Sequence, residues 1–236
     1  MNKLITAAAV SAGILLSTPA LARHVDVEIT NLTNGLYFTP LLVAAHDRDT
    51  HLFQAGTMAS YNLQLMAEGG NISGLIGDVD VAGGTYVANP AGGLLAPGAS
   101  ATATLKTKGR HNAYLSITGM LLPTNDGFVG LDALMIPKKK GTYTYLLNGY
   151  DAGTEANDEL IVGDSGGAPG TAGIPADPGG AGGTGGMGAA VADNNTTVHI
   201  HRGVLGDMDP EDGPSDLDSS VHRFNNPVAK VVVTVK

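Results

Sequence analysis

The chain has 236 residues, no cysteine and a formal net charge of −9 at pH 7. The lack of cysteine excludes disulfides, thiolate zinc sites and iron–sulfur chemistry. The excess of acidic residues disfavours binding to nucleic acid and favours binding of hard cations, which take oxygen ligands.

The first 22 residues have the features of an export signal. Lys3 supplies a positive charge, Leu4 to Leu16 is apolar, and Ala20-Leu21-Ala22 has the small-x-small form that a signal peptidase requires. The apolar run is shorter than the roughly 20 residues that span a bilayer. We therefore expect 1–22 to be a signal peptide, with a retained N-terminal anchor as the alternative. The mature chain would begin at Arg23, lack a membrane span, and reside in the periplasm or outside the cell.

Several segments have the composition of β-strands. Val25, Val27 and Ile29 alternate with polar residues, as they do in a strand with one buried face. The same alternation, or enrichment in Val, Ile, Thr, Tyr and Leu, predicts further strands at 101–105, 112–122, 141–147, 196–201 and 228–235. The last of these is almost continuously apolar. We expect it to be central and, with 25–29, to bring both ends of the mature chain into the sheet.

One helix is predicted, over Thr57 to Glu68. Thr57 can cap its N-terminus, Met58, Tyr61 and Leu65 would share one face, and Gly69-Gly70 would end it.

Many strands, few helices and long connections predict an all-β fold of two packed antiparallel sheets, a β-sandwich formed by the single domain 23–236. Residues 166–188 contain eleven glycines and three prolines and only one charged residue, Asp177. Such a segment buries too little apolar surface to offset its ordering entropy. We interpret 164–195 as a flexible Gly-rich insertion between two strands.

Two predicted turns carry carboxylates at strand ends. One is Pro123-Thr124-Asn125-Asp126-Gly127, and the other is Asp151-Ala152-Gly153-Thr154-Glu155. Calcium takes six to eight oxygen ligands, which carboxylates, carbonyls and water supply. Spacing alone leaves two interpretations open, a calcium site or solvated loop acids.

Longer stretches around these turns resemble the spondin N-terminal domain family. The matching stretches run through 38–46, 52–60, 123–130, 151–155 and 222–229. The order Asp-x-Phe-Val-Gly followed by Asp-Ala-Gly-Thr-acid carries most of the specificity, since each string alone is a weak signal.

The resemblance implies a β-sandwich related to C2 domains that holds one calcium ion through Asp126, Asp151 and Glu155. The chain departs from the family twice. Gly127 stands where animal members place a Trp, and Glu155 stands where they often have Asp, which would alter loop geometry and affinity. Animal members occur in extracellular-matrix proteins alongside other modules, so their adhesive role does not transfer automatically to a chain with one domain.

A third acidic stretch, 207–218, superficially resembles an EF-hand loop. An EF-hand places acids at positions 1, 3 and 5, Gly at 6 and a bidentate Glu at 12. Here the acids at 207, 209 and 211 take positions 1, 3 and 5, but the glycine comes one place late at Gly213, Pro210 intrudes, and Asp218 occupies the twelfth position. We interpret 207–218 mainly as a solvated acidic loop, with a second, weaker calcium site as the alternative.

Two histidines, His199 and His201, lie two apart on a predicted strand and share a face. With an acid they would offer a zinc or copper site, but no third ligand is suitably spaced, and ordinary hydrogen bonding is the simpler interpretation.

The sequence therefore predicts an exported calcium-binding interaction or adhesion module, not an enzyme. Calcium would order the loops at one end of the sandwich for an extracellular or cell-surface protein or glycan. A metal or small-molecule carrier that uses the strand histidines is the first alternative. A hydrolase is the second, although no Gly-x-Ser-x-Gly elbow is present, and a chain without Trp suits a sugar-stacking cleft poorly.

Overall fold

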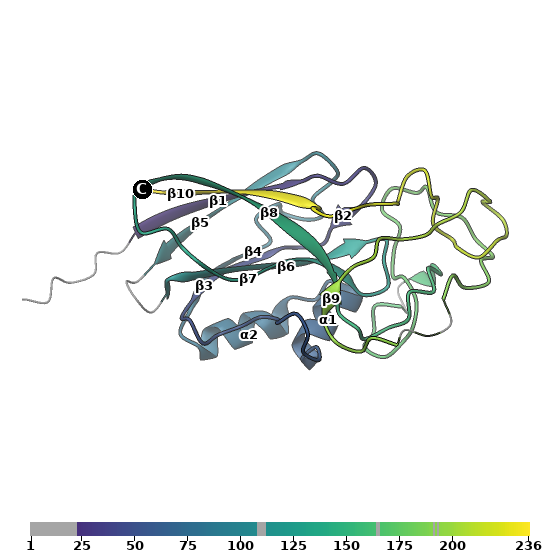
Figure 1. The fold of residues 1–236 in the computed structure, drawn as a ribbon, viewed down its shortest axis with the longest axis horizontal. Coiled ribbons are helices and arrows are strands. Elements are labelled where there is room, and N and C mark those ends of the chain that lie inside the picture. Colours follow the sequence, from purple (N-terminus) through teal and green to yellow (C-terminus); the bar gives the residue numbers. More distant parts are fainter. Residues whose placement is uncertain (1–22, 108–111, 164–165, 191, 193) are drawn as a thin grey trace, which may run out of the picture.

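The computed structural model describes residues 23–107, 112–163, 166–190, 192 and 194–236. Ten strands and two helices lie in these ranges (Figure 1). The strands are β1 (Arg23–Asn31), β2 (Tyr37–Phe38), β3 (Leu42–His46), β4 (Thr85–Ala88), β5 (Ser100–Thr107), β6 (Tyr114–Leu122), β7 (Gly127–Met135), β8 (Gly141–Asp151), β9 (His199–Ile200) and β10 (Ala229–Val235). The helices are α1 (Tyr61–Gly69) and α2 (Ser73–Val81).

The strands pair with one another in antiparallel orientation, which confirms the prediction of a mostly antiparallel β fold. The strands form one ten-stranded sheet in the order β4-β3-β6-β7-β8-β10-β1-β5, with β2 beside β6 and β9 beside β8. The sheet bends so that its two edge strands, β4 and β5, approach each other, and it is nearly closed into a barrel. The expected two separate sheets are therefore joined through β8, which crosses from one layer to the other (Figure 1).

The C-terminal strand is central, as its apolar composition predicts. β10 pairs with β8 on one side and β1 on the other, with Val27 opposite Val233. In β1 the side chains of Val25, Val27 and Ile29 are fully buried, while the residues between them are not. These alternating residues fill the main core between the two layers, because each layer turns one face inward.

A second apolar core lies between the lower layer and the helices. Phe53, Phe128 and Tyr150 form its aromatic part, with ring centroids 4.9–5.6 Å apart. Leu63 and Met66 of α1 cover it. Figure 1 shows both helices beneath this layer, on the side away from β10 and β1.

A helix is present in the predicted region, but the predictions of its first residue and of its buried face were wrong. Ser60, not Thr57, caps α1, since its Oγ accepts a hydrogen bond from the backbone N–H of Leu63 at 3.1 Å. The Thr57 hydroxyl instead donates to the carbonyl of Gln54 at 2.8 Å. Met58 lies outside the helix and is 76% exposed, because the chain turns into α1 only at residue 61. The predicted end is confirmed, with Gly70 in the left-handed conformation as C-cap.

Several elements were missed for identifiable reasons. Every residue of β3 is buried, so the strand shows no alternation. The helix α2 contains two glycines and no side-chain cap, and its local signals are weak. It forms because Leu75 and Val79 pack into the second core. The fold therefore has two short helices where one was expected.

The described part of the Gly-rich segment contains neither helix nor strand. It crosses the end of the sheet that carries the predicted site, where Ile174 is fully buried in the main core and makes an isolated bridge with Ile161. The flexibility of this segment remains a prediction. None of the helices in the described ranges is long and apolar enough to cross a membrane.

Candidate functional site

The predicted site residues from the two turns are brought together by the pairing of β7 with β8. Gly127 lies opposite Asp151 in this register, so Asp126 immediately precedes the point where Asp151 ends its strand. The backbone N–H of Ala152 donates to the carbonyl of Asp126 at 3.2 Å. The side chains of Asp126 and Asp151 are at most 1% exposed, and Glu155 is 8% exposed.

One oxygen of Asp126 orders the second turn. Its Oδ2 accepts hydrogen bonds from the Thr154 backbone N–H (2.8 Å), the Thr154 hydroxyl (3.1 Å) and the Glu155 backbone N–H (3.1 Å). The other oxygen, Oδ1, is buried and has no hydrogen-bond partner among the described residues. An unpaired buried oxygen costs free energy, and therefore indicates either a strained position or a place for a ligand.

Asp151 holds the same turn from the opposite strand. Its Oδ1 accepts from the Gly153 backbone N–H at 2.8 Å, and its Oδ2 accepts from the Asn157 side chain at 2.8 Å. Gly153 has a φ of 70° and lies so close to Thr196 and Thr197 that a Cβ would come within 2.8 Å of their backbones. Glycine is therefore required here both by conformation and by space.

Glu155 connects the turn to the Gly-rich segment. Its Oε2 accepts hydrogen bonds from the Gly173 backbone N–H (3.0 Å) and the Asn125 side chain (3.4 Å). Its Oε1, like Asp126 Oδ1, is buried without a hydrogen-bond partner in the described ranges. Two of the three predicted acids thus each carry one unsatisfied buried oxygen.

The electrostatics of the cluster oppose ionisation. Burial raises the pKa of Asp126 to about 7, and the neighbouring charge of Asp151 adds to this effect. Burial also raises the pKa of Glu155 to about 8, with further contributions from the charges of Glu68 and Asp126. A divalent cation would reverse this balance, because it favours the charged form of every carboxylate near it.

The three acids suit calcium in their chemistry, since they offer hard carboxylate oxygens. As placed, however, the acids do not form a ready cage. Within the described ranges there is no group of three or more His, Asp or Glu side chains that could hold a metal ion. Loading of an ion at Asp126, Asp151 and Glu155 therefore requires at least one of these side chains to move.

The acidic stretch 207–218 forms a separate loop system. Its carboxylates mostly accept hydrogen bonds from backbone N–H groups nearby, such as Asp207 from Ser215 at 2.9 Å and Asp209 from Glu211 at 3.1 Å. A cavity of about 160 Å³ is lined by Asp207, Asp209, Asp216 and Asp218 among others. These contacts are those of acids that shape their own loops, and a second, weaker calcium site in this stretch stays a prediction.

The predicted histidine pair makes ordinary contacts. His199 places Nδ1 2.8 Å from the Thr197 carbonyl and 3.8 Å from an oxygen of Asp151. His201 is buried, accepts a hydrogen bond from the Gly203 backbone N–H at 2.9 Å, and packs against the ring of Phe224. His222 lies elsewhere, with Nε2 3.6 Å from Asp177. These contacts favour the simpler interpretation of the strand histidines.

Two buried acids near the site escaped prediction. Glu159 is 2% exposed, and its carboxylate accepts from the backbone N–H groups of Leu205 and Gly206 and from the Ser215 hydroxyl at 2.7–2.8 Å. It thereby ties the site turn to the 207–218 loop. Glu68 of α1 is fully buried and accepts from the Gly170 backbone N–H at 3.1 Å. No local sequence signal marks either residue, because their partners are remote in the chain.

The structure thus defines an all-β domain whose acid-bearing turns gather at one end of a nearly closed antiparallel sheet. The model of the family described as Spondin_N matches residues 30–164, more than half of the chain, and this chain belongs to that family. The matched range contains all three predicted site acids but ends before β9 and the central strand β10. The comparison with curated proteins found no match.

Proposed function

We propose that this protein is an exported, non-enzymatic binding module of the spondin type that takes up calcium at Asp126, Asp151 and Glu155. Calcium orders the turns and the part of the Gly-rich segment tied to Glu155, and this ordered end is presented to an extracellular protein or glycan. The family membership supports the class of module. A C2-like relationship of the fold belongs to the same proposal.

One observation carries the calcium proposal. Asp126 Oδ1 and Glu155 Oε1 are both buried without a hydrogen-bond partner in the described ranges, in neighbouring turns whose acids repel one another. A cation would satisfy both oxygens and remove the repulsion. Calcium binding requires at least one of the three acidic side chains to move. The free energy gained on binding would drive this movement and would appear as added stability of the folded state.

Calcium should raise the melting temperature of the wild-type protein. A ligand at about 100 times its Kd adds about 2.7 kcal/mol, which for a domain of this size corresponds to roughly 5–10 °C. The Asp151→Asn variant should lose this shift and melt below wild type in calcium. Thermal melts in calcium and in chelator, together with calorimetric titration, measure both effects.

Asp209→Asn provides the matched control, because it removes the same charge from an exposed loop acid. It should keep the full calcium shift. A wild-type protein that melts at the same temperature with calcium and with chelator would refute the proposal. If the calcium-induced rise in melting temperature survives in Asp151→Asn but is lost in Asp209→Asn, the ion binds at the 207–218 loop instead.

A further inference from the structure

Basic side chains gather at the end of the sheet opposite the acidic turns. Strand register places them side by side, because Lys106 of β5 pairs with His24 of β1, and the β10 residue Val235 pairs with Val25 on one side and with Gly141 of β8 on the other. The strand ends β5, β1, β10 and β8 therefore carry neighbouring cations. We call this set the basic row: Arg23, His24, Lys106, Lys138, Lys139, Lys140 and Lys236.

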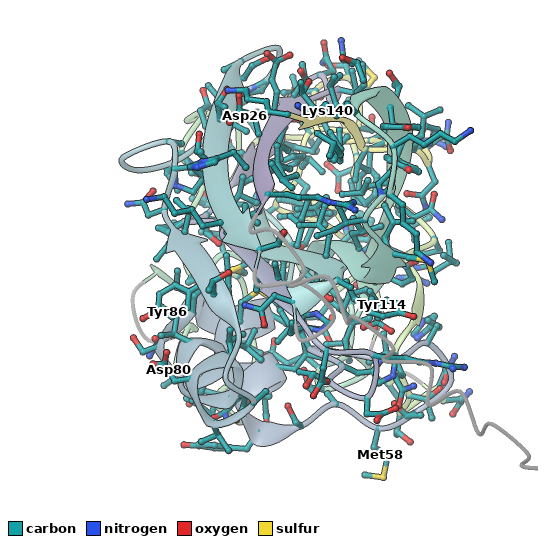
Figure 2. The ribbon with its side chains drawn as sticks, turned by 90° about the vertical axis from the view of Figure 1, so that its left-hand side faces the viewer. Asp26, Met58, Asp80, Tyr86, Tyr114 and Lys140 are labelled. Atoms are coloured by element: carbon teal, nitrogen blue, oxygen red, sulfur yellow. The ribbon has the colours of Figure 1, made fainter. Side chains whose placement is uncertain are left out.

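The lysines of the basic row are open to solvent. Lys106, Lys138, Lys139 and Lys140 are all exposed. Among the described residues, Asp26 is an acid that lies next to the row, and it forms an ion pair with Lys236. Figure 2, viewed from this end, shows Asp26 and Lys140 at the same upper edge, whereas Asp80 and Met58 lie toward the lower edge with the helices. The row thus keeps most of its positive charge.

The acidic end does not cancel this charge. β8 runs from Gly141, next to Lys140, to Asp151 at the candidate site, and its 11 residues span roughly 33 Å. Figure 1 shows the same separation, with the ends of β1 and β10 on the left and the loops after β8 on the right. The Debye length at physiological ionic strength is about 8 Å. The basic row therefore acts as an independent cationic surface on an otherwise acidic protein.

The shape of the row indicates the kind of partner. Neighbouring strands lie about 4.8 Å apart, so four strand ends place cations along a line of about 15 Å. A line of flexible, exposed ammonium groups suits a linear polymer with repeated negative charges, since lysine attracts anions as a point charge without demanding one geometry. Arg23 is half-buried, and its guanidinium donates to the carbonyl of Pro137. It therefore adds little to planar, bidentate recognition of an anion.

We propose that the basic row binds a linear acidic polysaccharide, sulfated or carboxylated, laid across the ends of β5, β1, β10 and β8. The choice of polysaccharide over nucleic acid rests on the proposed export of the protein. The binding does not require calcium, because the row and the candidate calcium site lie at opposite ends of the sheet. Each proposal can therefore fail without the other.

The test compares two charge-reversal variants that change net charge equally. Lys139→Glu/Lys140→Glu alters the row, and Arg202→Glu/Arg223→Glu alters two exposed cations outside it. Wild type should be retained on immobilised dextran sulfate or polygalacturonate at low salt, be released by added salt, and behave alike in calcium and in chelator. The row variant should bind the soluble polymer about tenfold or more weakly, whereas the control variant should bind as wild type does.

Three results would overturn this proposal. The first is a wild-type protein that neither polymer retains. The second is equal weakening in both variants, which would mean that only net charge matters. The third is binding of wild type to vesicles with anionic lipid headgroups but to neither polymer, which would assign the row to a membrane surface. Melting temperatures of both variants check that each is folded when it is assayed.

Discussion

In calcium-free buffer the wild-type protein should lose stability as the pH rises from about 4 to 8, and Asp126→Asn should lose about half of that dependence, since Glu155 contributes the rest. The pKa of Asp126 in the folded protein is about 7, above its ordinary value of 3.8. The protonated form is therefore favoured in the folded state. Its contribution to stability is complete below the unfolded pKa and disappears as the pH rises through the folded one.

The expected size of this effect is large for a single side chain. A pKa difference of about 3 corresponds to on the order of 4 kcal/mol. The pKa of Glu155, raised to about 8, adds to the same loss of stability at a slightly higher pH. Guanidinium unfolding at a series of pH values in chelator measures the free energy directly.

The variant distinguishes the source of the dependence. Asn can keep its side-chain oxygen as the acceptor for the N–H groups of Thr154 and Glu155, but it cannot ionise. Added calcium at pH 8 should restore the stability of wild type and leave Asp126→Asn almost unchanged. An unaltered pH dependence in the variant would show that Asp126 is not the group responsible.

Phe128→Ala should destabilise the protein by about 3–5 kcal/mol, a large share of the stability of a typical domain. Phe128 is fully buried in the second core, and its ring lies 5.0 Å from that of Phe53 and 5.6 Å from that of Tyr150. Truncation leaves a cavity that α1 and β7 cannot collapse to fill without breaking their other contacts.

The same substitution should weaken calcium binding. Phe128 follows Asp126 by two residues and pairs with Tyr150, next to Asp151, so a looser β7–β8 contact would disturb both turns. Tyr61→Ala is the matched control, since Tyr61 is 67% exposed and its loss should change stability by no more than about 0.5 kcal/mol. Denaturant midpoints that are equal for the two variants would contradict the role assigned to the second core.

Local pattern was sufficient for much of the fold. The alternation in 25–29 and 101–105 and the apolar 228–235 correctly indicated β1, β5 and a central β10, because a strand with a buried face must repeat with period two. The pairing of acids from the two turns was likewise foreseeable once they were assigned to strand ends and to a family motif. Gly70 ended α1 as expected, since glycine enters the left-handed conformation without steric cost.

Other features depend on contacts between residues that are far apart in the sequence. β3 and α2 have no local signal that outweighs the alternatives, and burial against remote residues selects their conformations. The near-barrel depends on β8 pairing with both β7 and β10, and the basic row depends on the register of four strands. The protonation of Asp126 and Glu155 depends on how deeply they are buried, which chain-distant segments determine because they supply the covering surface.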